Sequence, residues 1–306
     1  MANGIDYLMS VTEHLTAADP PAPRDLKYAV LHLQGAVEVL LKVRLLREHW
    51  TFVFPDLDHA KTTRDAFDSG DFKSCTTETA VSRLKKIAGV EIGERPARAL
   101  SRLTKSRNAL QHFGLTASAP QIEANAAEVL DFLLDFLHTQ LLPSLPAAEA
   151  GSTWTDLNTV RERLATIKSF LAKRHQQIRA ELAPLLHATV ECPLCGQWAM
   201  SVGVEEPTCR FCLVTWDDIG HLVMNYLGTF DRPGLEEARC PECGEQDLIL
   251  NARVAAHPDR ASALCFSCTA VLEHPVECSS CEELYERSAD DFGLCPDCLQ
   301  QRIDRF

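Results

Sequence analysis

Six Cys-x-x-Cys pairs occupy the C-terminal third of the 306-residue chain and account for twelve of its 13 cysteines. Each pair can form a tight knuckle, and two knuckles supply four thiolates in the tetrahedral arrangement that Zn²⁺ prefers. Neighbouring pairs are separated by 13, 21 and 13 residues, which suits a β-hairpin between knuckles. The spacing predicts three structural Zn²⁺ ions as cofactors. The expected ligands are Cys192, Cys195, Cys209 and Cys212; Cys240, Cys243, Cys265 and Cys268; and Cys278, Cys281, Cys295 and Cys298.

Other uses of these cysteines fit less well. A thioredoxin-like redox site needs a single pair that opens a helix after a strand, and a secreted disulfide framework would rarely space every cysteine in this way. Interleaving of the ligands of two sites stays open beside the pairing of neighbours. Four thiolates leave no position for a reactive water, so catalytic zinc is not expected. Cys75 stands outside the pairs. The spacing of the pairs resembles that of zinc ribbons, over most of residues 191–300.

A second candidate site is the stretch SRNALQHFG, residues 106–114, which places Arg107 and Asn108 ahead of His112. In a continuous helix Arg107 would fall within a stripe of leucines, where an unpaired charge is costly. Alternatively, the helix breaks near residues 104–106 and Ser106 caps a new one. Either way Arg107 needs an anionic partner. Glu38, which interrupts the apolar run AVEVLLK, is the obvious candidate.

An arginine followed by asparagine, with histidine five residues after the arginine, resembles the signature of HEPN (higher eukaryotes and prokaryotes nucleotide-binding) domains. The run AVEVLLKVRLL, with Glu38 and Lys42, is similar to the second helix of that family, and the resemblance covers about residues 5–142. It implies a helical, homodimeric, metal-independent endoribonuclease of toxin–antitoxin or anti-phage systems. Arg107 and His112 would then be catalytic, Asn108 a polar helper and Glu38 an orienting carboxylate.

The motif has competing interpretations. Arg44 and His49 repeat its spacing without the asparagine. Arg107 and His112 could instead be a buried ion pair with Glu38 and a core histidine, in a catalytically inactive scaffold whose ribbons recruit a protein or RNA. Arg95, Arg98, Arg102 and Lys105 form a stripe on another face of the same helix, which could follow an RNA backbone or be a solvated face.

Charge is concentrated in the tail. Residues 191–306 carry 8 Lys/Arg against 21 Asp/Glu, which equals the whole net charge of −13. Twelve thiolates and three Zn²⁺ ions would bring this tail to about −19. Phosphate binding needs clustered cations, so a DNA-binding ribbon regulator is disfavoured and a protein partner at the tail is favoured. We also expect the acidic tail to restrain the ribonuclease by competing with RNA for the arginine stripe.

The spacing of apolar residues predicts a mainly α fold. Helices are expected over 5–17, 25–50, 57–68, 77–88, the stretch after Pro96, 121–142 and 154–187, and strands within WAMSVGV, DLILNARV and SALCF. This gives a helical domain over 1–150, a connecting helix over 151–190 and three ribbons over 191–306. A short linker is expected at 147–153, where the first two of these meet. No signal peptide or membrane-spanning run is evident, so a cytoplasmic protein without membrane contact is expected.

Overall fold

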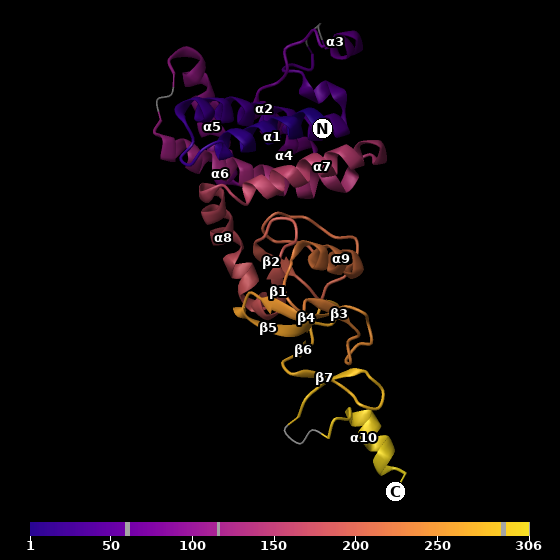
Figure 1. Cartoon of the computed structure of the whole chain (residues 1–306). Coiled ribbons are helices and arrows are strands. Elements are labelled where there is room, and N and C mark those ends of the chain that lie inside the picture. Colours follow the sequence, from indigo (N-terminus) through magenta and orange to yellow (C-terminus); the bar gives the residue numbers. More distant parts are fainter. Residues whose placement is uncertain (59–61, 115–116, 289–291, 306) are drawn as a thin grey trace. The chain divides into compact units, whose positions relative to one another are not determined.

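The computed structural model describes residues 1–58, 62–114, 117–288 and 292–305 (Figure 1). The chain divides into two compact units, Met1–Gln176 and Gln177–Phe306. The first unit is built from helices and the second contains small antiparallel sheets beside the cysteine clusters. This confirms the predicted fold class. No helix in the described ranges is both long and apolar enough to cross a membrane.

Helices of the first unit follow the predicted order closely. They are α1 (Ala2–Thr16), α2 (Pro23–Glu48), α3 (Arg64–Ser69), α4 (Thr77–Ile87), α5 (Glu94–His112), α6 (Ala119–Phe136) and α7 (Ala147–Leu164), and α8 (Lys168–Leu182) crosses the division between the units. Short 3-10 turns cover Trp50–Val53 and Leu142–Ser144, and a π-helical turn at Leu137–Leu141 prolongs α6.

Helices α1 and α2 form the centre of the first unit. Leu33, Leu40 and Leu41 of α2 are completely buried. At Gly4 of α1 an added Cβ would lie 2.6 Å from Leu40 Cδ2, so this glycine permits the close approach of the two helices. Pro23 opens α2, where a missing N–H costs nothing because the first turn lacks intrahelical acceptors. The buried face of α2 therefore fixes the position of its polar residues.

Two expectations about the chain after residue 140 were wrong. Residues 147–153 are the first turns of α7 rather than a linker, because Thr153 and Leu157 are buried and α7 packs on α1. The single helix expected over 154–187 is divided between α7 and α8. At the break the Thr166 hydroxyl donates a hydrogen bond to the Arg163 carbonyl oxygen (2.8 Å), a local contact that competes with helix continuation.

The second unit contains three antiparallel sheets. They pair β1 (Thr189–Glu191) with β2 (Trp198–Ser201), order β3 (Glu236–Ala238), β4 (Leu248–Val254), β5 (His257–Cys265) and β6 (Val271–Leu272) as neighbours, and pair β7 (Pro275–Glu277) with β8 (Leu284–Glu286). The three predicted β-like runs all contribute strands.

Two helices of the second unit were not predicted: α9, which covers Ile219–Thr229, and α10, which covers Pro296–Ile303. A 3-10 turn spans Ala183–Ala188, at the end of the helix expected over 154–187. The Asp218 side chain caps α9 by accepting a hydrogen bond from the His221 N–H at 2.8 Å. Tyr226 of α9 is completely buried and its ring meets that of Phe266 edge-on, with centroids 5.1 Å apart. This helix therefore belongs to the core of the second unit.

Candidate functional site

The twelve paired cysteines form three clusters, each made from neighbouring pairs as predicted. Within each cluster the four sulfur atoms all lie within 4.8 Å of one another. Sulfur–sulfur distances across knuckles are 3.9 Å for Cys192–Cys212, 3.7 Å for Cys240–Cys268 and 3.8 Å for Cys281–Cys295. Four thiolates around Zn²⁺ at about 2.3 Å would be spaced by about 3.8 Å. The clusters are positioned to bind metal ions, and the interleaved alternative is excluded.

A shared local conformation shapes five of the six knuckles. The residue after the second cysteine donates its N–H to the carbonyl oxygen of the first cysteine, at 2.8 to 3.0 Å. That residue has a positive φ in each case and is Gly196, Leu213, Gly244, Thr269 or Glu282. The sixth knuckle, Cys295–Cys298, runs directly into α10, where Leu299 makes the equivalent bond. The sequence signal is therefore the cysteine spacing, since glycine occupies only two of these positions.

Burial differs among the clusters. All four cysteines of the cluster that begins with Cys192 are buried, whereas two are exposed in the cluster that begins with Cys240. In the cluster that begins with Cys278 one cysteine is exposed and two are partly exposed. Cys75 lies in the first unit, outside all three clusters, and burial raises the pKa of its thiol.

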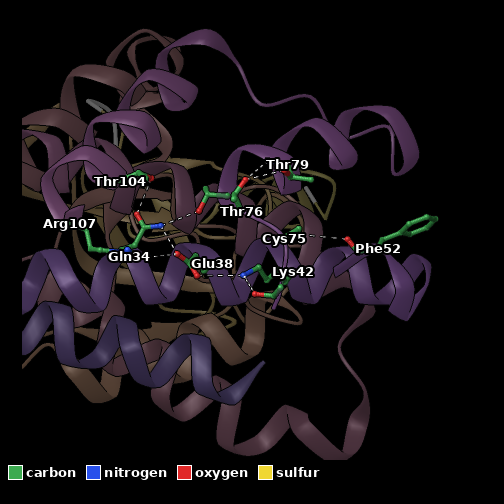
Figure 2. A network of polar contacts seen from close by, with 11 residues as sticks. Gln34, Glu38, Lys42, Phe52, Cys75, Thr76, Thr79, Thr104 and Arg107 are labelled. Atoms are coloured by element: carbon green, nitrogen blue, oxygen red, sulfur yellow. Dashed lines mark hydrogen bonds and ion pairs between the residues drawn. The ribbon is translucent and has the colours of Figure 1, made fainter. Parts of the chain in front are cut away.

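The predicted Glu38–Arg107 ion pair is present and joins α2 to α5 (Figure 2). Arg107 Nη2 lies 3.3 Å from Glu38 Oε1, and each side chain retains about 31% exposure. Helix α5 is continuous through residues 104–106, so Ser106 does not cap a new helix. The alternative of a fully buried pair is therefore wrong, because the guanidinium is held in place while part of it still faces solvent.

Glu38 is also the centre of a wider polar network that sequence reasoning missed. Its Oε1 accepts a hydrogen bond from Gln34 Nε2 at 2.9 Å, and its Oε2 lies 3.5 Å from Lys42 Nζ. Gln34 is nearly completely buried; its amide also donates to Thr77 Oγ1 and accepts from Thr104 Oγ1. In Figure 2, Gln34, Glu38, Thr104 and Arg107 point toward one another. The available signal was the four-residue spacing of Gln34, Glu38 and Lys42 along one face of α2.

Asn108 joins the arginine, but His112 does not. Arg107 Nη1 donates to Asn108 Oδ1 and to Gln111 Oε1, both at 3.1 Å. His112 is exposed at the end of α5, where its ring lies beside that of Phe113, with centroids 5.9 Å apart. Five helical residues turn through about 140° relative to the starting direction, so Arg107 and His112 occupy different faces of α5. The alternative of a core histidine is therefore wrong.

The chance copy of the motif has a different environment. Arg44 pairs with Glu48 one turn away at 2.6 Å, and His49 ends α2 with its Nδ1 2.9 Å from Thr51 Oγ1. Neither contact reaches across helices. This pair therefore provides matched control positions in the same unit.

Acidic side chains partly neutralise the arginine stripe of α5. Arg95 lies 3.4 Å from Glu128, Arg102 also bonds to Glu128, and Arg98 lies 3.9 Å from Glu94. For Lys105 the described part of the chain offers no ion pair. The stripe therefore presents less free positive charge than its sequence indicates.

Comparison of the chain with protein-family models, with curated proteins and with solved structures gives no match. The fold and its sites define the protein as an N-terminal helical domain followed by three four-cysteine clusters of the zinc-binding type.

Proposed function

We propose that the chain is a metal-independent endoribonuclease of the HEPN type that carries three structural zinc ions. The observation that supports this most is an arginine fixed by Glu38, yet partly open to solvent, on the helix that ends at an exposed histidine. This combination leaves a positioned guanidinium open to an anionic ligand. The resemblance of the Arg-Asn and histidine spacing to HEPN domains supplies the type of reaction.

The chemistry uses groups that RNA and the chain already have. The 2′-hydroxyl of RNA lies beside the scissile phosphate and can attack it. His112 would remove the 2′-hydroxyl proton or protonate the departing 5′-oxygen, a contribution of about 10²–10⁴-fold. Arg107 would donate two N–H groups to the phosphate and stabilise the charge that develops in the transition state. The products are a 2′,3′-cyclic phosphate and a 5′-hydroxyl.

A second copy of the chain would complete this site. Arg107 and His112 lie on different faces of α5, so the two side chains of one chain do not point at the same phosphate. A symmetric dimer that brings two α5 helices together supplies two arginines and two histidines to a shared cleft. We therefore propose a homodimer formed through the helical unit, with Asn108 helping to orient Arg107.

The cysteine clusters would hold Zn²⁺ for structure, and the ribbons would recognise a protein partner or regulate the nuclease. Cysteine ligation requires thiolates, which supports a reducing compartment such as the cytoplasm. The acidic tail supports recognition of a basic protein surface rather than DNA. Competition with RNA for the arginine stripe stays a prediction, weakened by the pairing of its arginines with Glu94 and Glu128. A toxin or anti-phage effector is the biological role that the resemblance favours.

A catalytically inactive scaffold is the second candidate. The buried Gln34 amide and the three groups that meet Glu38 favour it, because such a network also stabilises the packing of α2 on α5. In that case Arg107 would be a structural residue and His112 an ordinary surface histidine. The ribbons would then carry the function by recruiting a protein or RNA.

Single substitutions in the full zinc-loaded protein distinguish the two candidates. Arg107→Ala and His112→Ala should each abolish cleavage of single-stranded RNA while helical circular dichroism and the oligomeric state are unchanged. Arg44→Ala and His49→Ala are the matched controls and should cleave at the wild-type rate. Cleavage at the wild-type rate by both site variants would rule out the enzyme. Unfolding of both would favour the scaffold.

A further inference from the structure

A hollow of about 480 Å³ opens on the first unit where the start of α2 meets the end of α5. Its lining comes from Pro23, Arg24, Lys27 and Tyr28 of α2 and from Leu110 and Gly114 at the end of α5. Gly114 follows the last residue of α5, His112, which itself does not line the hollow. The hollow therefore lies at the end of α5, close in the chain to the proposed proton-transfer group.

Two cations and an aromatic ring give this hollow its chemistry. Arg24 and Lys27 are exposed and lie over the Tyr28 ring, with Arg24 Cζ and Lys27 Nζ at 5.7 and 5.8 Å from its centroid. In the part of the chain that the structure describes, neither cation forms an ion pair. The nearby carboxylate of Asp25 is already 3.0 Å from His14 Nδ1. Both cations are thus available to an anion from outside.

The tyrosine ring is held in a fixed orientation. Tyr28 is half-buried and stacks on His14, with centroids 5.3 Å apart and planes inclined by 21°. A ring that is already oriented loses little conformational freedom when a flat partner stacks on it. Aromatic rings beside cations bind single-stranded nucleic acid by stacking bases while the cations contact phosphates.

We propose that this hollow binds one nucleotide of a single-stranded RNA, with the phosphate at Arg24 and Lys27 and the base against Tyr28. The proposal rests on the proposed ribonuclease function and adds a subsite that holds the strand at the end of α5. A protein ligand is less favoured, because two cations without ion pairs beside one aromatic ring match the phosphate and the base of a single nucleotide.

Binding and cleavage are measured separately to test this. The full-length, zinc-loaded His112→Ala protein is titrated into a short, end-labelled, single-stranded RNA, and affinity is read from fluorescence anisotropy. Adding Arg24→Ala and Lys27→Ala should weaken binding roughly tenfold or more. The charge-matched control adds Lys73→Ala and Lys86→Ala, two exposed lysines of the same unit, and should change affinity much less. Equal weakening by both pairs would overturn the subsite in favour of nonspecific attraction.

Tyr28 provides a second, charge-neutral test. In the same background, Tyr28→Phe should retain affinity and Tyr28→Leu should lose roughly tenfold, because only the former keeps a ring for stacking. Equal affinity of both with the parent would overturn the stacking role. Circular dichroism shows whether the Tyr28→Leu protein still folds. Weaker RNA binding by the Tyr28→Phe protein, which keeps the ring, would also contradict the proposal.

Failure of this subsite differs from failure of the ribonuclease. If the wild-type chain cleaves RNA but the Arg24/Lys27 variant binds as the control does, the subsite is wrong and the enzyme stands. If that variant loses binding but the wild-type chain never cleaves, the subsite stands in an RNA-binding scaffold. Absence of RNA binding by every protein overturns the subsite and the ribonuclease together.

Discussion

At the residue scale, Glu38 connects the parts of the candidate site. It accepts from Gln34 and pairs with both Lys42 and Arg107, so one carboxylate serves three groups. Removing its charge would leave two cations close together on α2 and α5 without their shared partner. We therefore propose that Glu38 is a positioning residue that acts through Arg107.

We expect Glu38→Gln to slow RNA cleavage without unfolding the protein. A hydrogen bond to a charged group contributes about 1.5–3 kcal/mol, so the rate should fall roughly tenfold to a hundredfold. If Arg107 stabilises the transition state as proposed, kcat should fall more than KM rises, as single-turnover and steady-state kinetics would show. Glu48→Gln, which removes the partner of Arg44, is the control. An unchanged kcat would show that Glu38 does not position Arg107 for catalysis.

We expect two histidines of the first unit to make its free energy of unfolding depend on pH. Burial, and secondarily the charge of His14, lowers the pKa of His32, while burial together with Arg161 and Arg174 lowers that of His138. The unfolded chain, with histidine pKa values near 6.5, therefore binds more protons than the folded chain below neutral pH. Stability should be fully present above pH 6.5 and fall as the pH drops through 6.5 towards the folded-state pKa values.

Denaturant unfolding followed by helical circular dichroism measures this effect. The midpoint should be lower at pH 5.5 than at pH 7.5, with the pH dependence reduced in the His32→Gln/His138→Gln variant. A full wild-type difference between the two pH values in that double variant would contradict the assignment to these histidines.

At the element scale, a buried ion pair fastens the first part of α8 to α6. Arg174 Nη1 lies 2.8 Å from Asp131 Oδ1 and 3.1 Å from Asp135 Oδ1, and the arginine side chain is 3% exposed. Burial raises the pKa of Asp131 despite the opposing charge of Arg174. At Asp131 the cost of desolvating the carboxylate is thus larger than the attraction to Arg174. Each charge of the pair is therefore compensated only while the other is present.

Asp131→Asn should lower the free energy of unfolding of the first unit by about 3 kcal/mol, because it leaves the Arg174 charge buried with less compensation. Replacing both residues, as Asp131→Leu/Arg174→Met, should cost less than the single change. Chemical denaturation of the full zinc-loaded chain measures both. A double variant as unstable as Asp131→Asn would contradict the explanation from an uncompensated charge.

The elements that sequence predicted were those with strong local signals. Periodic apolar residues gave α1, α2, α4 and α6 to within a few positions, and the cysteine spacing gave all three clusters. The ion pair of Arg107 with Glu38 was also predictable, because an unpaired charge within a stripe of leucines would be costly. These signals lie in spacing along the chain.

Other features depend on contacts between distant segments. The helical start of α7 comes from packing on α1, which outweighs the weak helix propensity of Gly151 and Ser152. Gln34 joins Thr77 to Thr104 across 43 and 70 residues, a contact with no local signature. The pairing of the arginine stripe with Glu128 of α6 had no local signature either.

At the scale of the whole molecule, metal content and its order of loss are predictable. We expect three zinc ions per chain, unchanged by Cys75→Ser, because that thiol lies outside the clusters. A chelator should remove zinc first from the cluster that begins with Cys278, which has one buried cysteine against two in the cluster that begins with Cys240, and last from the fully buried cluster that begins with Cys192. The release is measured with a chelator whose absorbance changes when it binds zinc.

Substitutions identify the phases of that release. Cys298→Ser should remove the fast phase, and Cys195→Ser should leave that phase in place. Loss of the fast phase in the Cys195→Ser protein, or fewer than three zinc ions in a fully reduced sample, would contradict this assignment.

The central claim is that RNA is cleaved by its own 2′-hydroxyl with help from Arg107 and His112. The most direct measurement incubates the full chain, in EDTA at a concentration and time that leave the zinc content unchanged, with an RNA of mapped cleavage site. A matched RNA carries a 2′-deoxy nucleotide at that site. We predict cleavage of the first RNA to a 2′,3′-cyclic phosphate and a 5′-hydroxyl, no cleavage of the second at the substituted position, and none of either by His112→Ala. Cleavage of the 2′-deoxy position, or wild-type cleavage by His112→Ala, would contradict the account.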